Sequence, residues 1–196
     1  MARNAHECTD PELLSRWLNG DGRAGEALFD RHFARVRRFF CNKVPASEIE
    51  DLMQRTFAAC VEHAAQFRGE SRFSTYLLAI ANSQLHRWLR KHDPVREGLL
   101  PGASSVRDLG ISPSSVVGAR EAQTRVLLAL QHLPLDLQTV LELRYWEDLD
   151  SAEIATVVGA PRGTVRSRLH RARTLLRDRL LDARSAASCS LAQLAR

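Results

Sequence analysis

The sequence predicts an all-α protein made of two small helical domains joined by a flexible linker. Apolar residues recur at the three-to-four spacing of helices over residues 11–92 and again over 119–182. Between them, residues 93–118 are rich in proline, glycine and serine and keep no period, which is typical of a linker. No stretch alternates as a strand would, and residues 183–196 follow as a tail rich in small residues.

The composition is that of a soluble, cytoplasmic protein. Its 196 residues are 44% hydrophobic and 26% charged, and the net charge of +5 suits a protein that binds phosphate groups. The start, MARNAHECTD, lacks the apolar run of a signal peptide, and no stretch approaches the roughly 20 apolar residues that span a bilayer. The four cysteines are scattered, with no metal-ligand spacing, so we expect reduced thiols and neither metal nor cofactor.

The first domain is expected to contain three amphipathic helices. The first ends near Pro45, and its apolar residues are Ala27, Leu28, Phe33, Val36, Phe39 and Phe40. The second begins near Ser47, which forms a capping-box pattern with Glu50. Its apolar residues are Ile49, Leu52, Met53, Phe57, Cys60 and Val61. The third runs from Ser74 to about His92, with the apolar stripe Leu77, Ile80, Ala81, Leu85 and Trp88.

The polar face of that third helix permits two interpretations. Asn82, His86 and Arg90 line up at four-residue spacing, with Arg87 and Lys91 beside them. Cations near a helix C-terminus also interact well with the helix dipole, so this face is either a solvated helix end or a surface for nucleic acid.

Residues 150–177 carry the pattern of a helix-turn-helix. Asp150 precedes Glu153 by three residues, a second capping box, and Gly159 suits the tight turn after a short helix. Two supporting helices are expected upstream, separated by Pro134. Their apolar residues are Val126, Leu127, Leu130 and Leu133, then Leu137, Val140, Leu141 and Tyr145.

The second helix of this motif, from about Arg162, has two distinct faces. One narrow stripe, predicted to face the core, consists of Val165, Leu169, Ala172 and Leu176. The opposite face presents Ser167, His170, Arg171 and Thr174, flanked by Arg166 and Arg173. Seven arginines between Arg162 and Arg179 are opposed only by Asp178, which predicts contact with the DNA major groove and its phosphates.

Both halves resemble sigma factors of the extracytoplasmic-function class within the sigma-70 family. HLPLDLQTVLELRYWEDLDSAEIATVVGAPRGTVRSRLHRAR is similar to region four of these proteins. EALFDRHFARVRRFF, EIEDLMQRTF and FRGESRFSTYLLAIANSQLHRWLRKH are similar to region two. The resemblance implies a factor that binds core RNA polymerase, directs it to promoters and promotes DNA melting, without being an enzyme. An anti-sigma factor is a further candidate partner, and the chain is expected to be monomeric outside the holoenzyme.

The resemblance also implies three sets of site residues. Polymerase would contact Asp51, Gln54 and Thr56, with Phe57 packing beneath them. The downstream promoter element, where a base leaves the stack and enters a pocket, would be bound by Arg68, Ser71, Arg72, Ser74, Thr75, Asn82, His86, Arg87, Arg90 and Lys91. The upstream element would be bound by Arg162, Thr164, Arg166, Ser167, His170, Arg171 and Arg173. Arg55 departs from the acid usual in the family, and His170 stands at a variable position.

Two other classes of protein fit the sequence less well. An ordinary helix-turn-helix regulator would bind palindromes as a dimer, but Leu176, Leu180 and Leu181 form only a short apolar seam. An enzyme is disfavoured because no phosphate-binding loop, nucleophile elbow or metal-ligand motif occurs.

Overall fold

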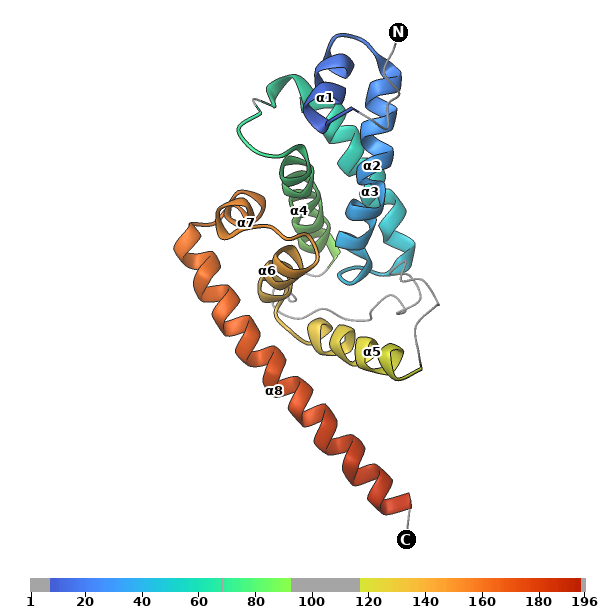
Figure 1. Ribbon diagram of the computed structural model, residues 1–196, viewed down its shortest axis with the longest axis vertical. Coiled ribbons are helices and arrows are strands. Elements are labelled where there is room, and N and C mark those ends of the chain that lie inside the picture. Colours follow the sequence, from blue (N-terminus) through green and yellow to red (C-terminus); the bar gives the residue numbers. More distant parts are fainter. Residues whose placement is uncertain (1–7, 68, 93–116, 195–196) are drawn as a thin grey trace.

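The computed structural model describes residues 8–67, 69–92 and 117–194, and within these ranges every regular element is a helix. The all-α prediction is confirmed. Most of the predicted linker, residues 93–116, lies outside the described residues, as does Arg68. The helices form two units, one before and one after that gap (Figure 1).

The first unit consists of α1 (Asp10–Leu18), α2 (Gly22–Cys41), α3 (Ala46–His63) and α4 (Phe73–His92). A short 3-10 turn, Ala64–Gln66, follows α3. Helices α2, α3 and α4 pack on one another, and α1 packs across the start of α2. Glycine is required at position 25, because a Cβ there would lie 2.6 Å from Cδ1 of Trp17 in α1.

Several local predictions for this unit need correction. The Ser47–Glu50 capping box does not form: α3 begins at Ala46 after Pro45, and no side chain caps it. Phe33 and Val61, predicted as core residues, are 51% and 52% exposed. Phe33 instead stacks on Phe57 at the surface, with ring centroids 6.3 Å apart. Periodicity places a residue near the apolar face, but whether another helix covers that residue depends on the tertiary packing.

The second unit consists of α5 (Val117–Gln131), α6 (Leu135–Tyr145), α7 (Ser151–Val158) and α8 (Arg162–Leu194). Helices α5, α6 and α7 all pack against α8. Figure 1 shows that the C-terminal half of α8 extends away from the other helices. The helix reaches Leu194, within the segment that the sequence predicts as a tail.

The helix-turn-helix forms as the sequence predicts. The Asp150 Oδ1 atom accepts hydrogen bonds from the N–H groups of Ala152 and Glu153, and the Glu153 carboxylate accepts one from the N–H of Asp150. These backbone N–H groups hold the pKa of Asp150 below its usual value. Gly159 ends α7 in the left-handed conformation, with φ +63°. Glycine adopts that conformation without strain, which allows the chain to turn into α8.

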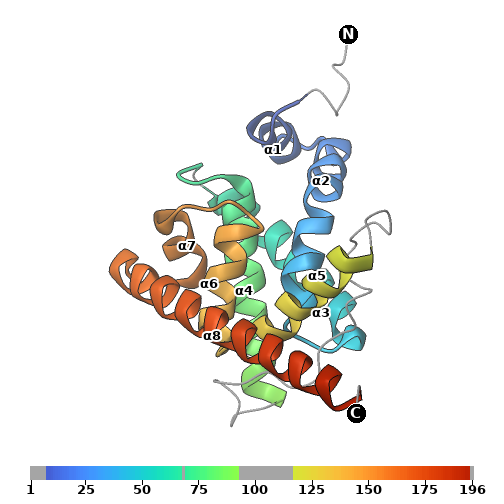
Figure 2. The same ribbon diagram turned by 60° about the horizontal axis from the view of Figure 1, so that its bottom comes forward.

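The two units also pack against each other, which the sequence does not predict. Helix α7 packs against α4, and both views show the two helices side by side (Figure 1 and Figure 2). Helix α6 bonds to Asn42 and Lys43, just after α2, through Gln138 and Glu142. Buried apolar residues of both units belong to one continuous core, with Leu77 and Ala81 of α4 in the same cluster as Ile154 and Val157 of α7.

Candidate nucleic-acid interface

The outer face of α8 carries the predicted upstream-element residues. Val165, Leu169 and Ala172 are buried on its inner side, so the predicted phase of the helix is confirmed. The opposite side is open to solvent. Arg162, Arg166, Ser167, His170, Arg171 and Arg173 are exposed there, and Thr164 is half-buried. These residues are brought together on one helical surface about three turns long.

Two arginines of α8 have partners on α6. The Nε atom of Arg173 donates to the hydroxyl of Tyr145 at 3.0 Å, and its guanidinium lies 5.8 Å from the centre of that ring. Tyr145, predicted as an apolar core residue, is 62% exposed and provides this contact instead. Arg168 forms an ion pair with Asp136 at 3.1 Å. Both contacts hold α8 against its supporting helix, and Arg173 is consequently directed toward Tyr145.

The predicted downstream-element residues do not form one open surface. Ser74, Thr75 and Asn82 are buried, His86 is half-buried, and the Nδ2 atom of Asn82 donates to the Val157 carbonyl of α7 at 3.4 Å. Ser71 is half-buried, and Arg72 is exposed but forms an ion pair with Glu153 of the second unit at 3.2 Å.

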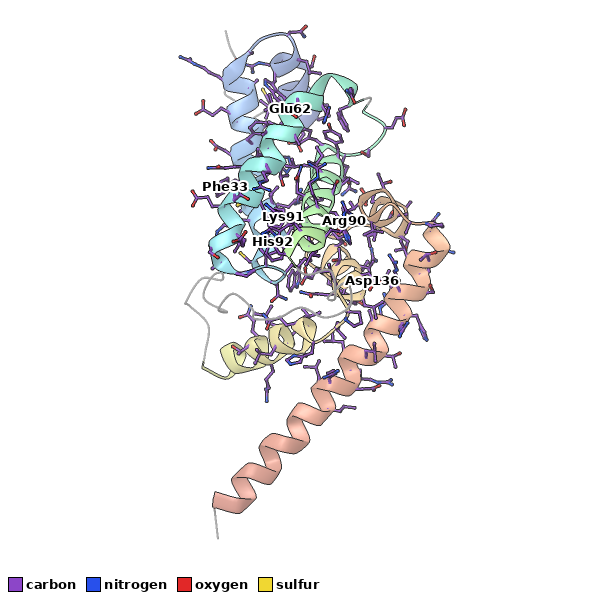
Figure 3. All side chains as sticks on the ribbon, turned by 180° about the vertical axis from the view of Figure 1, so that it is seen from behind. Phe33, Glu62, Arg90, Lys91, His92 and Asp136 are labelled. Carbon is purple, nitrogen blue, oxygen red and sulfur yellow. The ribbon has the colours of Figure 1, made fainter. Side chains whose placement is uncertain are left out.

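The C-terminal end of α4 differs from its centre. Arg87, Arg90 and Lys91 are exposed, and Figure 3 shows Arg90 and Lys91 at this end of the helix. The structure therefore leaves one cationic end of the predicted downstream surface open and covers its middle with α7. The predicted face from Asn82 to Arg90 is therefore interrupted at Asn82, which contacts α7, whereas Arg90 stays exposed.

The predicted polymerase-binding residues lie on the outer side of α3, with one exception. Asp51 is half-exposed, Gln54 is exposed, and Arg55 forms an ion pair with Asp51 at 2.8 Å. Thr56 is fully buried, and its hydroxyl donates to the Leu52 carbonyl at 2.7 Å. The expectation that Thr56 offers a polar contact is therefore wrong for this arrangement, because its hydroxyl is used within the helix.

Phe57 belongs to an aromatic cluster that the sequence did not indicate as a surface feature. Phe57 is half-buried and packs against Phe29, with ring centroids 5.0 Å apart, and against the exposed ring of Phe33. Phe33 is thus an additional candidate contact residue next to Asp51 and Gln54. Its apolar spacing on α2 predicted a core position, and no local signal distinguishes the two cases.

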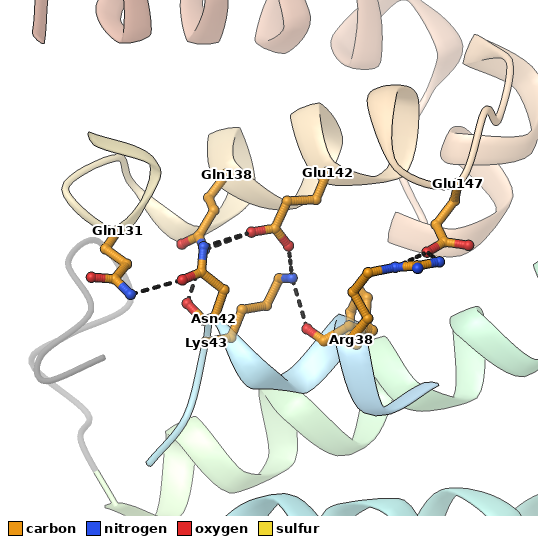
Figure 4. A network of polar contacts seen from close by, with 8 residues as sticks. Arg38, Asn42, Lys43, Gln131, Gln138, Glu142 and Glu147 are labelled. Carbon is orange, nitrogen blue, oxygen red and sulfur yellow. Dashed lines mark hydrogen bonds and ion pairs between the residues drawn. The ribbon is translucent and has the colours of Figure 1, made fainter. Parts of the chain in front are cut away.

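A buried polar network joins the two units (Figure 4). Lys43, just after α2, is completely buried and forms an ion pair with Glu142 of α6. Glu142 also accepts hydrogen bonds from Asn42 at 3.2 Å and from Gln138 at 2.8 Å. Gln131 donates to the Asn42 side chain at 2.7 Å. The partners Lys43 and Glu142 are 99 residues apart, so no pattern of local spacing could have paired them.

The described residues include no group of three or more histidine, cysteine or acidic side chains placed to hold a metal ion. Over the same residues no helix is long and apolar enough to cross a membrane.

Comparison with known sequences identifies two family regions in this chain. The family region described as Sigma-70 region 2 matches residues 28–95, and the one described as Sigma-70, region 4 matches residues 123–176. The ECF RNA polymerase sigma-E factor of Haemophilus influenzae is 30% identical over 184 residues, covering 90% of this chain and 97% of that protein. The protein of the same name from Escherichia coli is 28% identical over 189 residues, covering 90% and 96%.

Solved structures share the fold. The structure of CnrH in complex with the cytosolic domain of CnrY matches with a TM-score of 0.64 at 24% identity, over 92% of this chain and 99% of that chain. The sigma factor RpoE of Bartonella quintana, crystallised with the anti-sigma factor NepR, matches with a TM-score of 0.60 at 22% identity. That match covers 78% of this chain and 93% of the RpoE chain.

Proposed function

This chain belongs to the extracytoplasmic-function sigma factors of the sigma-70 family, and we propose that three separate helix faces divide its work in transcription initiation. The outer face of α8 reads the upstream promoter element, the outer face of α3 binds core polymerase, and α4 with the segment before it binds the downstream element. The observation that carries the proposal is the open basic face of α8 on a completely formed helix-turn-helix.

Upstream recognition follows from the chemistry of the α8 face. Arg171 is exposed on it, and Arg166 is exposed at its edge, about 1.4 turns nearer the start of the helix. Arginine is suited both to phosphate oxygens and to the O6 and N7 acceptors of guanine in the major groove. Ser167 and His170, also exposed there, add hydrogen-bonding groups that can distinguish base edges. The buried side of the helix, anchored by Val165 and Leu169, sets the direction in which these groups point.

Polymerase binding is assigned to the outer face of α3. Asp51 and Gln54 offer polar groups there, and the ring of Phe33 stacked on Phe57 offers an apolar contact. An exposed aromatic ring stacked on a half-buried one beside polar groups has the composition of an interface centre, where aromatics are enriched. Arg55 pairs with Asp51 within the same helix, so the carboxylate of Asp51 must exchange this partner if polymerase offers it a cation.

Downstream binding is assigned to α4, the segment before it and the cations at the end of that helix. Arg87, Arg90 and Lys91 are exposed and suited to backbone phosphates. Phe67 and Tyr76 form an aromatic pair with centroids 4.7 Å apart beside the segment that precedes α4. An unpaired base can stack on such rings, which offsets part of the few kcal/mol that unpairing and unstacking cost.

The second unit also presents a groove suited to a protein partner. It lies between α5, α6 and α8, has a volume of about 480 Å³, and is lined by Val126, Leu141, Leu176 and Leu180 with Arg125, Arg173 and Arg177 around them. An apolar groove with arginines at its edges fits an amphipathic helix with acidic flanks. We assign this groove to an anti-sigma factor, the type of partner with which the Bartonella relative was crystallised. The cytoplasm is the proposed place of action.

Reconstituted transcription tests the proposal. Purified protein and bacterial core polymerase are incubated with a genomic library, and the RNA starts are sequenced with and without the protein. The proposal expects starts that require the protein and share two motifs at a fixed spacing. It fails if an active polymerase gives no such starts while the protein alone binds palindromic DNA, which is the behaviour of an ordinary dimeric regulator.

A further inference from the structure

We infer that Asp136 and Tyr145, near the two ends of α6, are positioning residues for upstream recognition. Each holds one arginine of α8, Arg168 or Arg173, and together the two contacts fix the rotation of α8 about its own axis. The other basic residues of the α8 face are left to contact DNA. The inference rests on the proposed function of that face and adds two residues of a different helix to it.

The two contacts lie on opposite flanks of the buried stripe of α8. The stripe consists of Val165, Leu169 and Ala172, which are all buried. At about 100° per residue, Arg168 lies roughly 70° to one side of this stripe and Arg173 roughly 70° to the other. The buried stripe sets the distance between α8 and its neighbours, whereas the two flank contacts oppose rotation in opposite senses. A rotation of α8 in either direction must therefore stretch one of them.

The contact with Tyr145 determines where Arg173 points. The Nε atom of Arg173 donates to the Tyr145 hydroxyl at 3.0 Å, and the guanidinium lies 5.8 Å from the centre of the ring, within the range of cation–π attraction. Both residues line the groove between α5, α6 and α8. The Arg173 guanidinium is therefore held on the groove side of α8 and not at the centre of its outer face.

The opposite flank is held at the start of α6. An Asp136 carboxylate oxygen lies 3.1 Å from the Nε atom of Arg168, and Figure 3 shows Asp136 between the start of α6 and α8. The two residues line a hollow of about 460 Å³ together with Ser167 and Arg171 of the proposed DNA-binding face. Because a hollow occupies this flank, an ion pair and not close packing restrains α8 there.

A small rotation of α8 is enough to disturb base recognition. A helix with its side chains is about 10–12 Å in diameter, so a rotation of about 20° moves a group at its surface by roughly 2 Å. Hydrogen bonds to base edges are lost over such a distance, whereas attraction to the phosphates changes little. The two flank contacts should therefore contribute to discrimination between DNA sequences more than to affinity for DNA in general.

The charge of Asp136 separates a positioning role from a purely electrostatic one. Its side chain is 42% exposed and shares the hollow with Arg171. If only charge mattered, removing this acid would strengthen the attraction of the face to phosphates and leave discrimination unchanged. If Asp136 positions α8, removing it weakens discrimination although the net charge becomes more favourable for DNA.

The test uses holoenzyme assembled from the full-length protein and core polymerase. One DNA duplex carries a promoter found by mapping transcription starts, and a second carries the same promoter with its upstream motif scrambled. Binding titrations give the ratio of the two affinities, in which any change in polymerase binding cancels. The slope of log affinity against log salt concentration reports the number of phosphate contacts.

We expect Asp136→Asn and Tyr145→Leu each to lower this affinity ratio about threefold to tenfold at an unchanged salt slope, a part of what one good base contact contributes. Asp148→Asn, the same charge change at an exposed acid in the loop after α6, is the control and should keep the wild-type ratio. Arg171→Ala, which removes a proposed DNA contact, should weaken promoter binding roughly 5- to 150-fold.

The inference is overturned if Asp136→Asn or Tyr145→Leu keeps the wild-type ratio while Arg171→Ala weakens binding. If Arg171→Ala binds the promoter as tightly as the wild type, the proposed function of the α8 face fails, and the inference fails with it. Exposed polar contacts add little to the free energy of unfolding, so circular dichroism should show wild-type helical content. Loss of helical content would assign these residues to folding and overturn the positioning role.

A double-mutant cycle tests whether Arg173 and Tyr145 act as one unit. Arg173→Ala should lower the affinity ratio as much as Tyr145→Leu does, at an unchanged salt slope, and the double variant should be no worse than either single one. A salt slope reduced by about one in Arg173→Ala would make Arg173 a phosphate contact and overturn its assignment. Additive losses in the double variant would overturn it as well.

Discussion

The two proposed DNA-binding faces of this protein, on α8 and on α4, carry similar side chains but differ in accessibility. The face on α8 presents Arg166 and Arg171 to solvent, because the helices that pack on α8 lie on its other side. The face on α4 has Asn82 buried under α7, because α4 packs against α3 on one side and α7 on another. Residue chemistry therefore predicts what a helix face can bind, whereas the neighbouring helices decide whether that face is accessible.

The largest expected effect is on stability and comes from a substitution in α7, the helix that supports both faces. Ile154 of α7 is fully buried, and α7 packs against both α4 and α8. Truncation of Ile154 to alanine leaves a cavity, so we expect a loss of about 2–5 kcal/mol in the free energy of unfolding. Urea unfolding followed by circular dichroism measures it. Val126→Ala, at a position 36% exposed, should change stability by no more than about 0.5 kcal/mol. Equal effects of the two variants would contradict the assigned role of α7.

A substitution on the open face should affect DNA recognition alone. Arg171→Ala removes an exposed arginine of α8 and should weaken promoter-dependent initiation by about 1–3 kcal/mol, or roughly 5- to 150-fold. Polymerase assembly should be intact, because the α3 face is unchanged. Run-off transcription and co-purification with core polymerase measure the two properties. Arg179→Ala, farther along α8, is the control. Loss of assembly in Arg171→Ala would show that the role given to this face is wrong.

The α3 face should respond in the opposite way. Asp51→Lys reverses an exposed charge at the proposed polymerase contact and should weaken binding of core polymerase about tenfold, or roughly 1.4 kcal/mol. The exposed pair with Arg55 contributes little to stability, so the fold should be retained. Glu50→Lys, the same charge change at the adjacent exposed residue, is the control, and a binding titration measures both. Unchanged affinity for Asp51→Lys would remove this residue from the contact.

The smallest expected effect concerns His32 and Asp10, where α1 meets α2. The His32 ring also packs against Phe73 at the start of α4, with ring centroids 5.3 Å apart. Burial lowers the pKa of His32 below its usual value, although the Asp10 carboxylate 2.8 Å away opposes the shift. Partial burial would raise the pKa of Asp10, but hydrogen bonds from Arg31 and His32 hold it below its usual value. The unfolded chain therefore binds a proton at His32 more readily than the folded protein does. The stability of the fold is fully present above the ordinary histidine pKa of 6.5, and it declines as the pH falls below that value.

Thermal unfolding measured between about pH 7.5 and 5.5 tests this dependence of stability on pH. This range brackets the ordinary histidine pKa of about 6.5. The wild-type Tm should fall on acidification, and His32→Gln should reduce the slope. The Asp10 contribution is lost only near and below its ordinary value of 3.8, outside this range. Identical slopes in the two proteins would exclude His32 as the cause. Upstream DNA binding by the variant should be unchanged, because His32 lies on the side of α2 that faces α1, away from α8.

Local patterns determined the helices and the orientation of the recognition surface. The capping box at Asp150 and the turn at Gly159 depend on neighbouring residues, and the stripe from Val165 to Ala172 repeats within one helix. Such signals extend over a few turns, so the sequence was sufficient to predict them. The same kind of signal failed at Ser47 and Phe33, where a preceding proline and an uncovered helix face changed the outcome.

By itself, therefore, the sequence determined an all-helical chain with a helix-turn-helix and its basic outer face. Only the tertiary structure decided that α7 covers Asn82, that Thr56 is buried, and that Lys43 pairs with Glu142 across 99 residues. The physical reason is that helix formation and capping depend on near neighbours, whereas burial of a polar side chain depends on which distant surface packs against it. That packing covers the middle of the α4 face at Asn82 and leaves the cationic end of the same helix open.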